Sequence, residues 1–533
     1  MTDHAIGAHH EGGKTFLGHP TGLFVLFFTE MWERFSYYGM RALLVLYLTK
    51  HFLFDREAAY GLYGAYTTLV YITPVIGGYL ADKYLGARKA VTIGAIFLVL
   101  GHLGMAIEGD PVTTGAAPDA GVLNIFYFSL ALIITGVGFL KANISTIVGS
   151  LYKKTDVRRD SAFTIFYVGI NTGAFLGALI AGYLGETFGW AYGFGAAGIG
   201  MLLGLIVFVW GKPALRGAGE PHDPKQLVEP VAGPLNREHM IWLGAAATTL
   251  IVWFLVRSQG TVNTLLTIAM VVTYLYILWH SMTKLKPHER ARIIVALVLI
   301  STNVLFWGLF EQAGSSLNLF TDEHVDRNLL GWEVPASMFQ SINAFYIMAL
   351  GPVFAGLWIW LGKRGWEPSS PMKFALALVQ LGLGFLVLVW GASGNAGLTP
   401  VIFIFLIYLL HTTGELCMSP VGLSSMTRLS VTNMVGLMMG AWFLASGAGN
   451  AVAAIIAQAT ASGGEGVEQV LAVYTKVGWV AIGVAILFAL ASPFLTKMEH
   501  LDTLTDEDEA EDLPTVDTFG SNTDPGTPEK TLG

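Results

Sequence analysis

Long apolar segments recur along the chain at lengths that fit a lipid bilayer. An α-helix needs about 20 mostly apolar residues to cross the hydrocarbon core. The first six such segments lie at about 22–50, 59–83, 88–107, 122–149, 160–184 and 190–210. A pair follows at about 240–256 and 261–280, and six more lie at about 293–319, 336–362, 372–391, 400–427, 434–460 and 470–495. This pattern predicts an all-α polytopic membrane protein with about 14 transmembrane helices, grouped as six, two and six.

Polar stretches between these groups indicate the domain boundaries. A stretch rich in proline, glycine and charge precedes the pair, and the chain becomes acidic and rich in proline and threonine near its end. The second composition is typical of disorder. We therefore expect a cytoplasmic N-terminal tail (1–20), an N-terminal six-helix bundle (21–211), a cytoplasmic linker (212–239), an inserted helical hairpin (240–285), a C-terminal six-helix bundle (286–496) and a disordered acidic cytoplasmic tail (497–533).

The loops differ in charge. Basic residues such as Lys83, Arg88 and Lys89 follow the second segment, whereas the opposite loops contain acids such as Glu108 and Asp110. Because positively charged loops stay in the cytoplasm, we expect both termini to lie there. The N-terminus has no apolar core followed by a small-residue cleavage site, so we expect no signal peptide. The sequence thus predicts a multi-pass protein of the cell membrane, plasma or inner, surrounded by lipid.

Composition agrees with this class and excludes others. Of the 533 residues 53% are hydrophobic and 13% charged, with a mean hydropathy of +0.58, whereas soluble domains carry about 25% charge. The single cysteine, Cys417, forms no intramolecular disulfide. The chain has no glycine-rich phosphate loop with its lysine, so the sequence gives no support for a process driven by ATP. Histidines in the apolar segments are scattered singly, so we expect no metal site, no other cofactor and no nucleic-acid partner, and the chain is not expected to be an enzyme.

The two groups of six look like copies of one another. "TPVIGGYLADKYLGARKA", after the second segment, has a degraded copy in "GPVFAGLWIWLGKRGWEPSSPMKFA", after the eighth of the twelve outer segments. The first and seventh share a Leu-Phe-aromatic start followed by an acid, in "LFFTEMWER" and "LFWGLFEQ". Parallel six-helix repeats indicate the major facilitator architecture, with a substrate site between the halves near the midplane.

The first segment has a polar face. Each charge at the bilayer centre costs roughly 3 kcal/mol, so this face needs a compensating environment. Its members fall at i, i+3, i+4, i+7, i+8 and i+11, which is one side of a helix. They are Glu30, Glu33, Arg34, Tyr37, Tyr38 and Arg41. We expect this face to look into a cavity; a self-neutralising Glu30–Arg34 pair that only fixes helix packing is the alternative.

Three further charges lie in apolar segments: Lys141, Glu311 and Glu415. If the halves are repeats, the fourth and tenth helices are equivalent, so Lys141 and Glu415 face each other near the cytoplasmic mouth. By the same reasoning Arg41 meets Glu311 near the outer end. We expect these two pairs to act as latches that break when their side of the cavity opens. The alternative for each is a charge that extends from a helix end toward the interface.

The signs of these charges indicate the cargo and the energy source. Cations on one wall and acids on the other suit a zwitterion with separated ends. Broad aromatic surface is available, although ordinary helix packing is the commoner role of any one aromatic. The candidates are Tyr37, Tyr38, Tyr71, Trp307, Trp442 and Phe443. Arginine does not release a proton near neutral pH, whereas a carboxylate can, so Glu30 and Glu33 beside Arg34 are the candidate proton carriers.

Four motifs resemble those of one family. "EMWERFSYY" at 30–38 resembles the ExxERFxYY signature of the proton-dependent oligopeptide transporters, within the major facilitator superfamily. "GGYLADKYLGARK" resembles the superfamily's loop after its second helix, "FYVGINTGA" the family's fifth-helix motif, and "GELCMSPVGLSSMTRLS" its tenth-helix segment. The resemblance extends from the first outer helix to the twelfth, and bacterial members have the extra central hairpin.

The resemblance implies import of di- and tripeptides, coupled to inward proton flow by alternating access, with the proton gradient as the energy source. Residues matching those that hold the peptide's carboxylate and backbone are Arg41, Lys141, Tyr38, Tyr71, Asn171 and Asn343. Glu415, with Ser419 nearby, matches the site for the amino group; Trp307, Trp442 and Phe443 match side-chain pocket aromatics. The family also pairs the equivalents of Arg41 with Glu311 and of Lys141 with Glu415.

One departure and one alternative accompany this prediction. Animal members carry a coupling histidine on the second helix, where this chain has Gly64, so coupling would depend on Glu30, Glu33 and their charged neighbours. The alternative keeps the fold and changes the cargo to nitrate, an organic anion or a drug. Glu415 argues against an anion carrier, which has little use for a buried acid facing its substrate. We expect a functional monomer.

Overall fold

The computed structural model of the protein describes residues 15–501, except 154–155, 157, 222, 395–396, 432–433 and 463–465. Most of the predicted N-terminal tail (1–20) and of the predicted disordered tail (497–533) therefore lies outside the described residues. The remaining chain is almost entirely helical, which confirms the predicted fold class.

The N-terminal half contains six long helices. These are α1 (Thr21–Lys50), α2 (Arg56–Leu80), α3 (Ala87–Met105), α4 (Ala120–Ser150), α5 (Arg158–Phe188) and α6 (Trp190–Gly211). Short helical turns follow two of them, η1 (Ala81–Leu85) after α2 and η2 (Lys212–Leu215) after α6. The short helix α7 (Pro224–Val228) and the inserted pair α8 (Arg237–Leu255) and α9 (Gln259–Lys284) connect the halves.

The C-terminal half repeats the plan with one interruption. Its helices are α10 (Pro287–Phe310), α11 (Ser316–His324), α12 (Ser341–Gly362), α13 (Ser370–Ser393), α14 (Ile402–Leu429), α15 (Val435–Ala461) and α16 (Val467–Met498). Two 3₁₀ turns accompany them, η3 (Glu311–Gly314) between α10 and α11 and η4 (Ala336–Gln340) before α12. The segment expected as one span at 293–319 is therefore a broken helix.

The strands are two- and three-residue pieces outside the bundles. They are β1 (Thr15–Phe16), β2 (His19–Pro20), β3 (Pro230–Ala232), β4 (Leu235–Asn236), β5 (Val325–Asp326), β6 (Asn328–Leu329), β7 (Trp332–Glu333) and β8 (Thr399–Pro400). Three of the four pairs are antiparallel hairpins, and β5 pairs with β8 in parallel. They close loops and contribute little to the core.

Within the described part of the chain, 12 helices are long and apolar enough to cross a membrane. Helices α1 and α2 complete the predicted fourteen by length, with 30 and 25 residues. Helix α1 is less apolar because it carries the charged face, and α2 because tyrosine, glycine and threonine recur along it.

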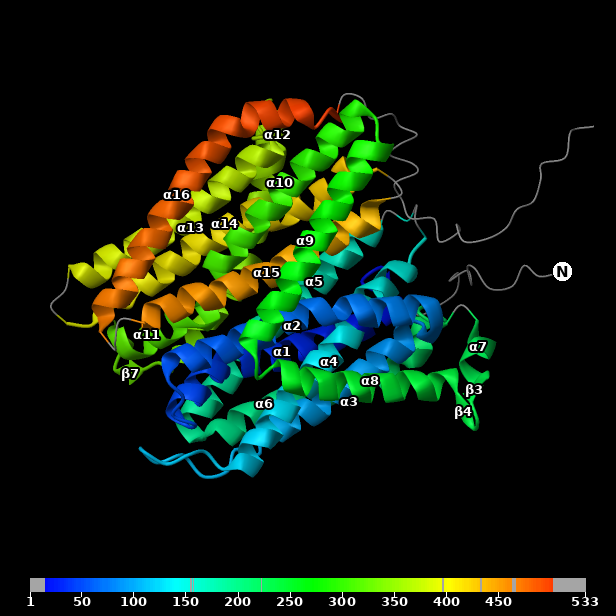
Figure 1. The fold of residues 1–533 in the computed structure, drawn as a ribbon, viewed down its shortest axis with the longest axis horizontal. Coiled ribbons are helices and arrows are strands. Elements are labelled where there is room, and N and C mark those ends of the chain that lie inside the picture. The colour runs from blue at the N-terminus through cyan, green and yellow to red at the C-terminus, as the bar shows by residue number, and fades with distance from the viewer. Residues whose placement is uncertain are drawn as a thin grey trace, which may run out of the picture.

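The two halves lie against each other as two layers, each around its own apolar core (Figure 1). Helix α2 packs on α15 and α5 on α12, which joins the halves. Helix α8 packs on α4, while α9 contacts α2 and α15 near its start and α10 near its end. The inserted pair therefore contacts both halves at their edge and stays away from the interface centre.

Glycines let α1 approach α5 closely. A Cβ on Gly173 would lie 2.1 Å from the backbone oxygen of Met31, and one on Gly177 would lie 2.3 Å from that of Phe35. Real side chains do not tolerate such distances, so only glycine fits here. Small residues at such contacts are common between membrane helices. This contact fixes the helix that carries the charged face against the helix that carries Asn171.

Candidate functional site

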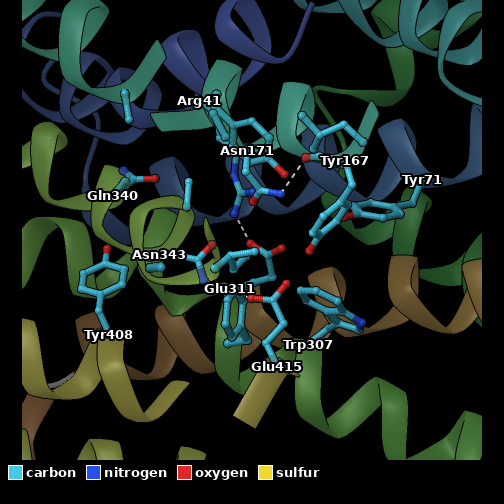
Figure 2. Close-up of a pocket in the computed structure, with 18 residues that line it drawn as sticks. Arg41, Tyr71, Tyr167, Asn171, Trp307, Glu311, Gln340, Asn343, Tyr408 and Glu415 are labelled. Carbon is cyan, nitrogen blue, oxygen red and sulfur yellow. Dashed lines mark hydrogen bonds and ion pairs between the residues drawn. The ribbon is translucent and has the colours of Figure 1, made fainter. Parts of the chain in front are cut away.

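A cavity of about 170 Å³ lies between the two halves. Its walls come from α1, α2 and α5 on one side and from α10, η3, η4, α12 and α14 on the other. Eight of the predicted site residues line it: Tyr38, Arg41, Tyr71, Asn171, Trp307, Glu311, Asn343 and Glu415 (Figure 2). The repeats therefore bring residues more than 370 positions apart in the sequence into one chamber.

Arg41 and Glu311 form an ion pair across this chamber. Nη2 of Arg41 contacts Oε2 of Glu311, and Nε donates to the hydroxyl of Tyr63 at 2.6 Å. Both charged side chains are buried. One guanidinium thus joins α1 and α2 of the first half to the broken helix of the second. The predicted pair is present, and its role as a latch stays a prediction.

The break between α10 and α11 positions Glu311. Helix α10 ends at Phe310, and the single 3₁₀ turn that follows begins with Glu311. The neighbouring Gln312 holds this turn, because its Nε2 donates to the carbonyls of Gly308 and Ala453, each at 3.0 Å. Irregular backbone at membrane depth is tolerated where it lines a cavity. The break therefore aims a carboxylate at Arg41.

Further polar contacts join the halves on the same side as this pair. Lys50 contacts Asp322 at 2.7 Å and Arg56 contacts Glu323 at 2.8 Å. Amides of Asn318 and Gln340 both donate to the backbone oxygen of Ala42, at 2.9 and 3.3 Å. We call this set, with the Arg41–Glu311 pair, the closed end of the interface.

Glu186 adds a carboxylate to the closed end. It lies near the end of α5 and accepts from the backbone N–H of Ala336 at 3.2 Å and of Ser337 at 2.8 Å. It also accepts from the Ser337 hydroxyl at 2.5 Å. Because the free N–H groups at the start of a helical turn attract anions, this contact holds η4 against the first half.

Glu30, Glu33 and Arg34 form a compact buried cluster outside the cavity. Nε of Arg34 lies 2.8 Å from Oε1 of Glu30 and 2.6 Å from Oε2 of Glu33. The side chains are at most 7% exposed. Two carboxylates face one guanidinium, so a single proton neutralises the cluster. The packing alternative, a balanced Glu30–Arg34 pair, does not account for the second carboxylate.

The second predicted latch is not formed in this conformation. Nζ of Lys141 lies 4.0 Å from the centre of the Tyr71 ring, and no ion pair joins it to Glu415 in the described part of the protein. Glu415 instead accepts from Nδ2 of Asn343 at 3.0 Å, while the same nitrogen donates to Thr412. The halves therefore hold Lys141 and Glu415 on separate walls.

Four other predicted residues do not line the cavity. Tyr37 is buried and stacks on Tyr66, and Trp442 packs into the C-terminal core against Phe374. Phe443 is 44% exposed, and Ser419 is partly buried with no partner for its Oγ among the described residues. Tyr37 and Ser419 lie on helices that line the cavity, α1 and α14, but on other faces of them. Trp442 and Phe443 lie on α15, which contributes no lining residue, and Trp442 is turned toward its own bundle.

Three polar lining residues were missed by the sequence analysis: Tyr167, Gln340 and Tyr408. Tyr167 precedes Asn171 by one turn of α5, and Tyr408 precedes Glu415 by two turns of α14, so helical spacing from these two predicted site residues would have found both. Gln340 lies in η4, where no helical spacing applies.

Two helix bundles with a charged, partly aromatic cavity between them define a membrane transporter of the major facilitator type. The model of the POT family matches residues 88–500 of this chain. The chain belongs to the POT family, a family of transporters.

Bacterial relatives extend the comparison over most of the chain. Peptide transporter YePEPT of Yersinia enterocolitica is 38% identical over 469 residues, covering 84% of this chain and 89% of the relative. The uncharacterized transporter YclF of Bacillus subtilis is 39% identical over 459 residues, covering 83% and 89%. The dipeptide and tripeptide permease B of Edwardsiella piscicida is 32% identical over 497 residues, covering 90% and 96%.

Solved structures with the same fold contain bound small molecules. A mutant of the peptide transporter POT in complex with alafosfalin matches with a TM-score of 0.78 and 35% identity, covering 91% of this chain and 97% of that one. A POT family transporter in complex with 5-aminolevulinic acid matches with a TM-score of 0.77 and 29% identity, covering 91% and 98%.

Proposed function

We propose that this protein is a proton-coupled symporter that imports di- and tripeptides across the cell membrane by alternating access. The observation that carries this proposal is the chamber itself, in which Arg41 from one half faces Glu311 and Glu415 from the other. A small peptide is a zwitterion with its two charges at opposite ends. Three relatives named as peptide transporters or permeases support the same cargo.

Each end of the peptide has a matching group. Glu415 lines the chamber with one face of its carboxylate held by Asn343, so it remains available to a substrate ammonium. Arg41 is the cation that reaches the chamber, with Lys141 behind the Tyr71 ring. Arg41 is occupied by Glu311, so a substrate carboxylate has to compete for it. Protonation of Glu311 would free the guanidinium for the peptide.

The proton path begins at the cluster of Glu30, Glu33 and Arg34, which lies on the same helix face as Arg41. Charged, the two glutamates hold Arg34; neutral, they free it. A buried charge that loses its partner is strongly destabilising, so a proton and a pairing change occur together. Protons thereby decide which cations are available to the substrate.

Alternating access follows from the two ends of the interface. The closed end is held by contacts between the halves, while the Lys141–Glu415 pair on the other side is unformed. With the basic loops in the cytoplasm, the closed end faces outward and both termini lie inside. We assign this conformation to the inward-facing state of a functional monomer in the cell membrane, driven by the proton gradient without another cofactor.

Uptake of labelled dialanine into proteoliposomes tests the proposal. An imposed inward proton gradient should drive accumulation above the external concentration in the wild type. Glu415→Gln should raise KM for dialanine at least tenfold, because the substrate ammonium loses its counter-charge. Glu333→Gln is the matched control, because Glu333 is exposed and pairs with Arg327 within one half. This variant should keep wild-type uptake. Absence of dialanine uptake, or wild-type kinetics in Glu415→Gln, would contradict the proposal.

A different small zwitterion is the second candidate cargo. The complex of a POT family transporter with 5-aminolevulinic acid favours it, because that molecule also carries an ammonium and a carboxylate. Competition of dialanine uptake by 5-aminolevulinic acid distinguishes a peptide-selective carrier from a broader one. Nitrate is disfavoured, since Glu311 and Glu415 both face the chamber.

A further inference from the structure

The chamber has two chemically different sides. Aromatic rings line one side: Tyr71, Tyr167 and Trp307 (Figure 2). Gln340 and Tyr408 lie on the opposite side, with the charged groups between the two sides. A dipeptide whose charged ends are held at the centre therefore presents its two side chains to two different surfaces.

Gln340 is fixed with its amide oxygen free. It ends the 3₁₀ turn η4, and its Nε2 donates to the backbone oxygen of Ala42 at 3.3 Å. This contact sets the orientation of the amide. The Oε1 atom has no hydrogen-bond partner in the described residues, and it is not among the polar atoms sealed from solvent. Gln340 therefore offers an acceptor to the chamber.

Tyr408 offers a hydroxyl beside it. Its ring is buried, only 4% exposed, and lies seven residues before Glu415 on the same face of α14. Buried tyrosine hydroxyls usually have a partner, yet this one has none among the residues that the structure describes and still reaches the chamber. The hydroxyl is a donor and an acceptor without a protein partner.

We propose that Gln340 and Tyr408 form a subsite for a polar, uncharged side chain of the transported peptide, with a carboxamide as the best match. The carboxamide N–H donates to Oε1 of Gln340, and its oxygen accepts from the hydroxyl of Tyr408. A charged side chain fits poorly, because the charged ends of the peptide occupy Arg41 and Glu415, and an added buried charge then has no counter-charge. This inference rests on the proposed transport of peptides and adds a side-chain preference to it.

The same two residues have a competing structural role. Gln340 also belongs to the closed end through its contact with Ala42, so replacing it could alter gating for every substrate. Loss of a gating contact changes the affinity for all peptides equally. Loss of a subsite contact changes the affinity for each peptide according to its side chain. The ratio of two peptides of similar shape separates these roles.

Competition for dialanine uptake supplies this ratio. Asparagine and leucine side chains are similar in size and branching, so Ala-Asn is compared with Ala-Leu, and Asn-Ala with Leu-Ala. In Tyr408→Phe and Gln340→Met, the inhibition constant of the asparagine peptide relative to that of the matching leucine peptide should rise about three- to tenfold, as expected for one lost neutral hydrogen bond. This rise should appear in one of the two pairs, that is, with the variable side chain at either the first or the second position. Tyr346→Phe is the control, since its hydroxyl contacts the Phe405 backbone outside the chamber, and it should keep the wild-type ratio.

Two results would overturn the subsite. One is a wild-type ratio in both variants for both peptide orders. The other is an equal loss of affinity for all four peptides, which would assign the residues to gating alone. If no dipeptide competes in the wild type, the proposed function itself fails, and this outcome is distinct from a lost preference.

Discussion

At the residue scale, the proposed function depends on buried charged groups that share partners. Arg41 has two partners, one on each half, while the Glu30, Glu33 and Arg34 cluster contains one carboxylate more than it needs. The sequence predicted these groups because charges are rare in spanning helices and stand out by helical spacing. It did not predict Gln340, whose position depends on a turn, or the inward rotation of Trp442, which depends on packing.

Arginine at position 41 should be specifically required. Its Nε and Nη2 contact Tyr63 and Glu311 at the same time, which a lysine ammonium cannot reproduce with the same geometry. Arg41→Lys should therefore weaken dialanine binding about tenfold or more, the size expected for a lost charged hydrogen bond. The measurement is the inhibition constant of unlabelled dialanine against the uptake of labelled dialanine into proteoliposomes.

The control for Arg41 is Arg257→Lys, at the turn between α8 and α9, far from the chamber and in contact with Asn124. It should bind dialanine like the wild type. Equal affinity in Arg41→Lys and the wild type would show that the charge alone suffices at this position.

At the element scale, long apolar segments were predicted closely and irregular ones were not. Helices α3, α4 and α6 begin and end within two residues of the predicted segments, because their ends coincide with polar residues or glycine. The break at Glu311–Gly314 was predicted as continuous helix. No proline marks it, and the contact of Gln312 with α15 that stabilises it is a tertiary interaction.

The α1–α5 contact should be sensitive to one methyl group. Gly173→Ala places a Cβ 2.1 Å from the Met31 oxygen, so the helices must separate. Overpacking of this kind costs about 1–3 kcal/mol, and the melting temperature in detergent should fall. Gly195→Ala on α6 has open space around it and gains helix propensity, so its melting temperature should equal or exceed that of the wild type. Equal melting temperatures for Gly173→Ala and the wild type would contradict the close contact.

At the scale of the whole molecule, the halves are held together unequally. The closed end contains ion pairs and amide contacts between the halves, including Glu186 on the start of η4. Such contacts bias the equilibrium between two rocking states, and removing one shifts the populations. The repeat in the sequence predicted two bundles, but which end is closed depends on the sum of contacts between them.

Glu186→Gln should shift this balance, because an amide oxygen replaces a carboxylate that accepts three hydrogen bonds. Spin labels at the exposed Thr146 on α4 and Ser424 on α14, in a Cys417→Ser background, report the opposite end. Their distance distribution should move toward shorter values in Glu186→Gln. Glu333→Gln should match the wild type, and an unchanged distribution in Glu186→Gln would remove this contact from the closed end.

Coupling between peptide and proton transport is measured most directly by driving transport with a peptide gradient alone. Proteoliposomes with a pH-sensitive dye inside receive an inward gradient of dialanine and no imposed pH gradient. The interior should acidify with the wild-type protein, and it should not acidify with Glu33→Gln, although that variant should still exchange labelled for unlabelled dialanine. Acidification by Glu33→Gln at the wild-type rate, or dialanine entry into wild-type vesicles without acidification, would contradict proton coupling through this cluster.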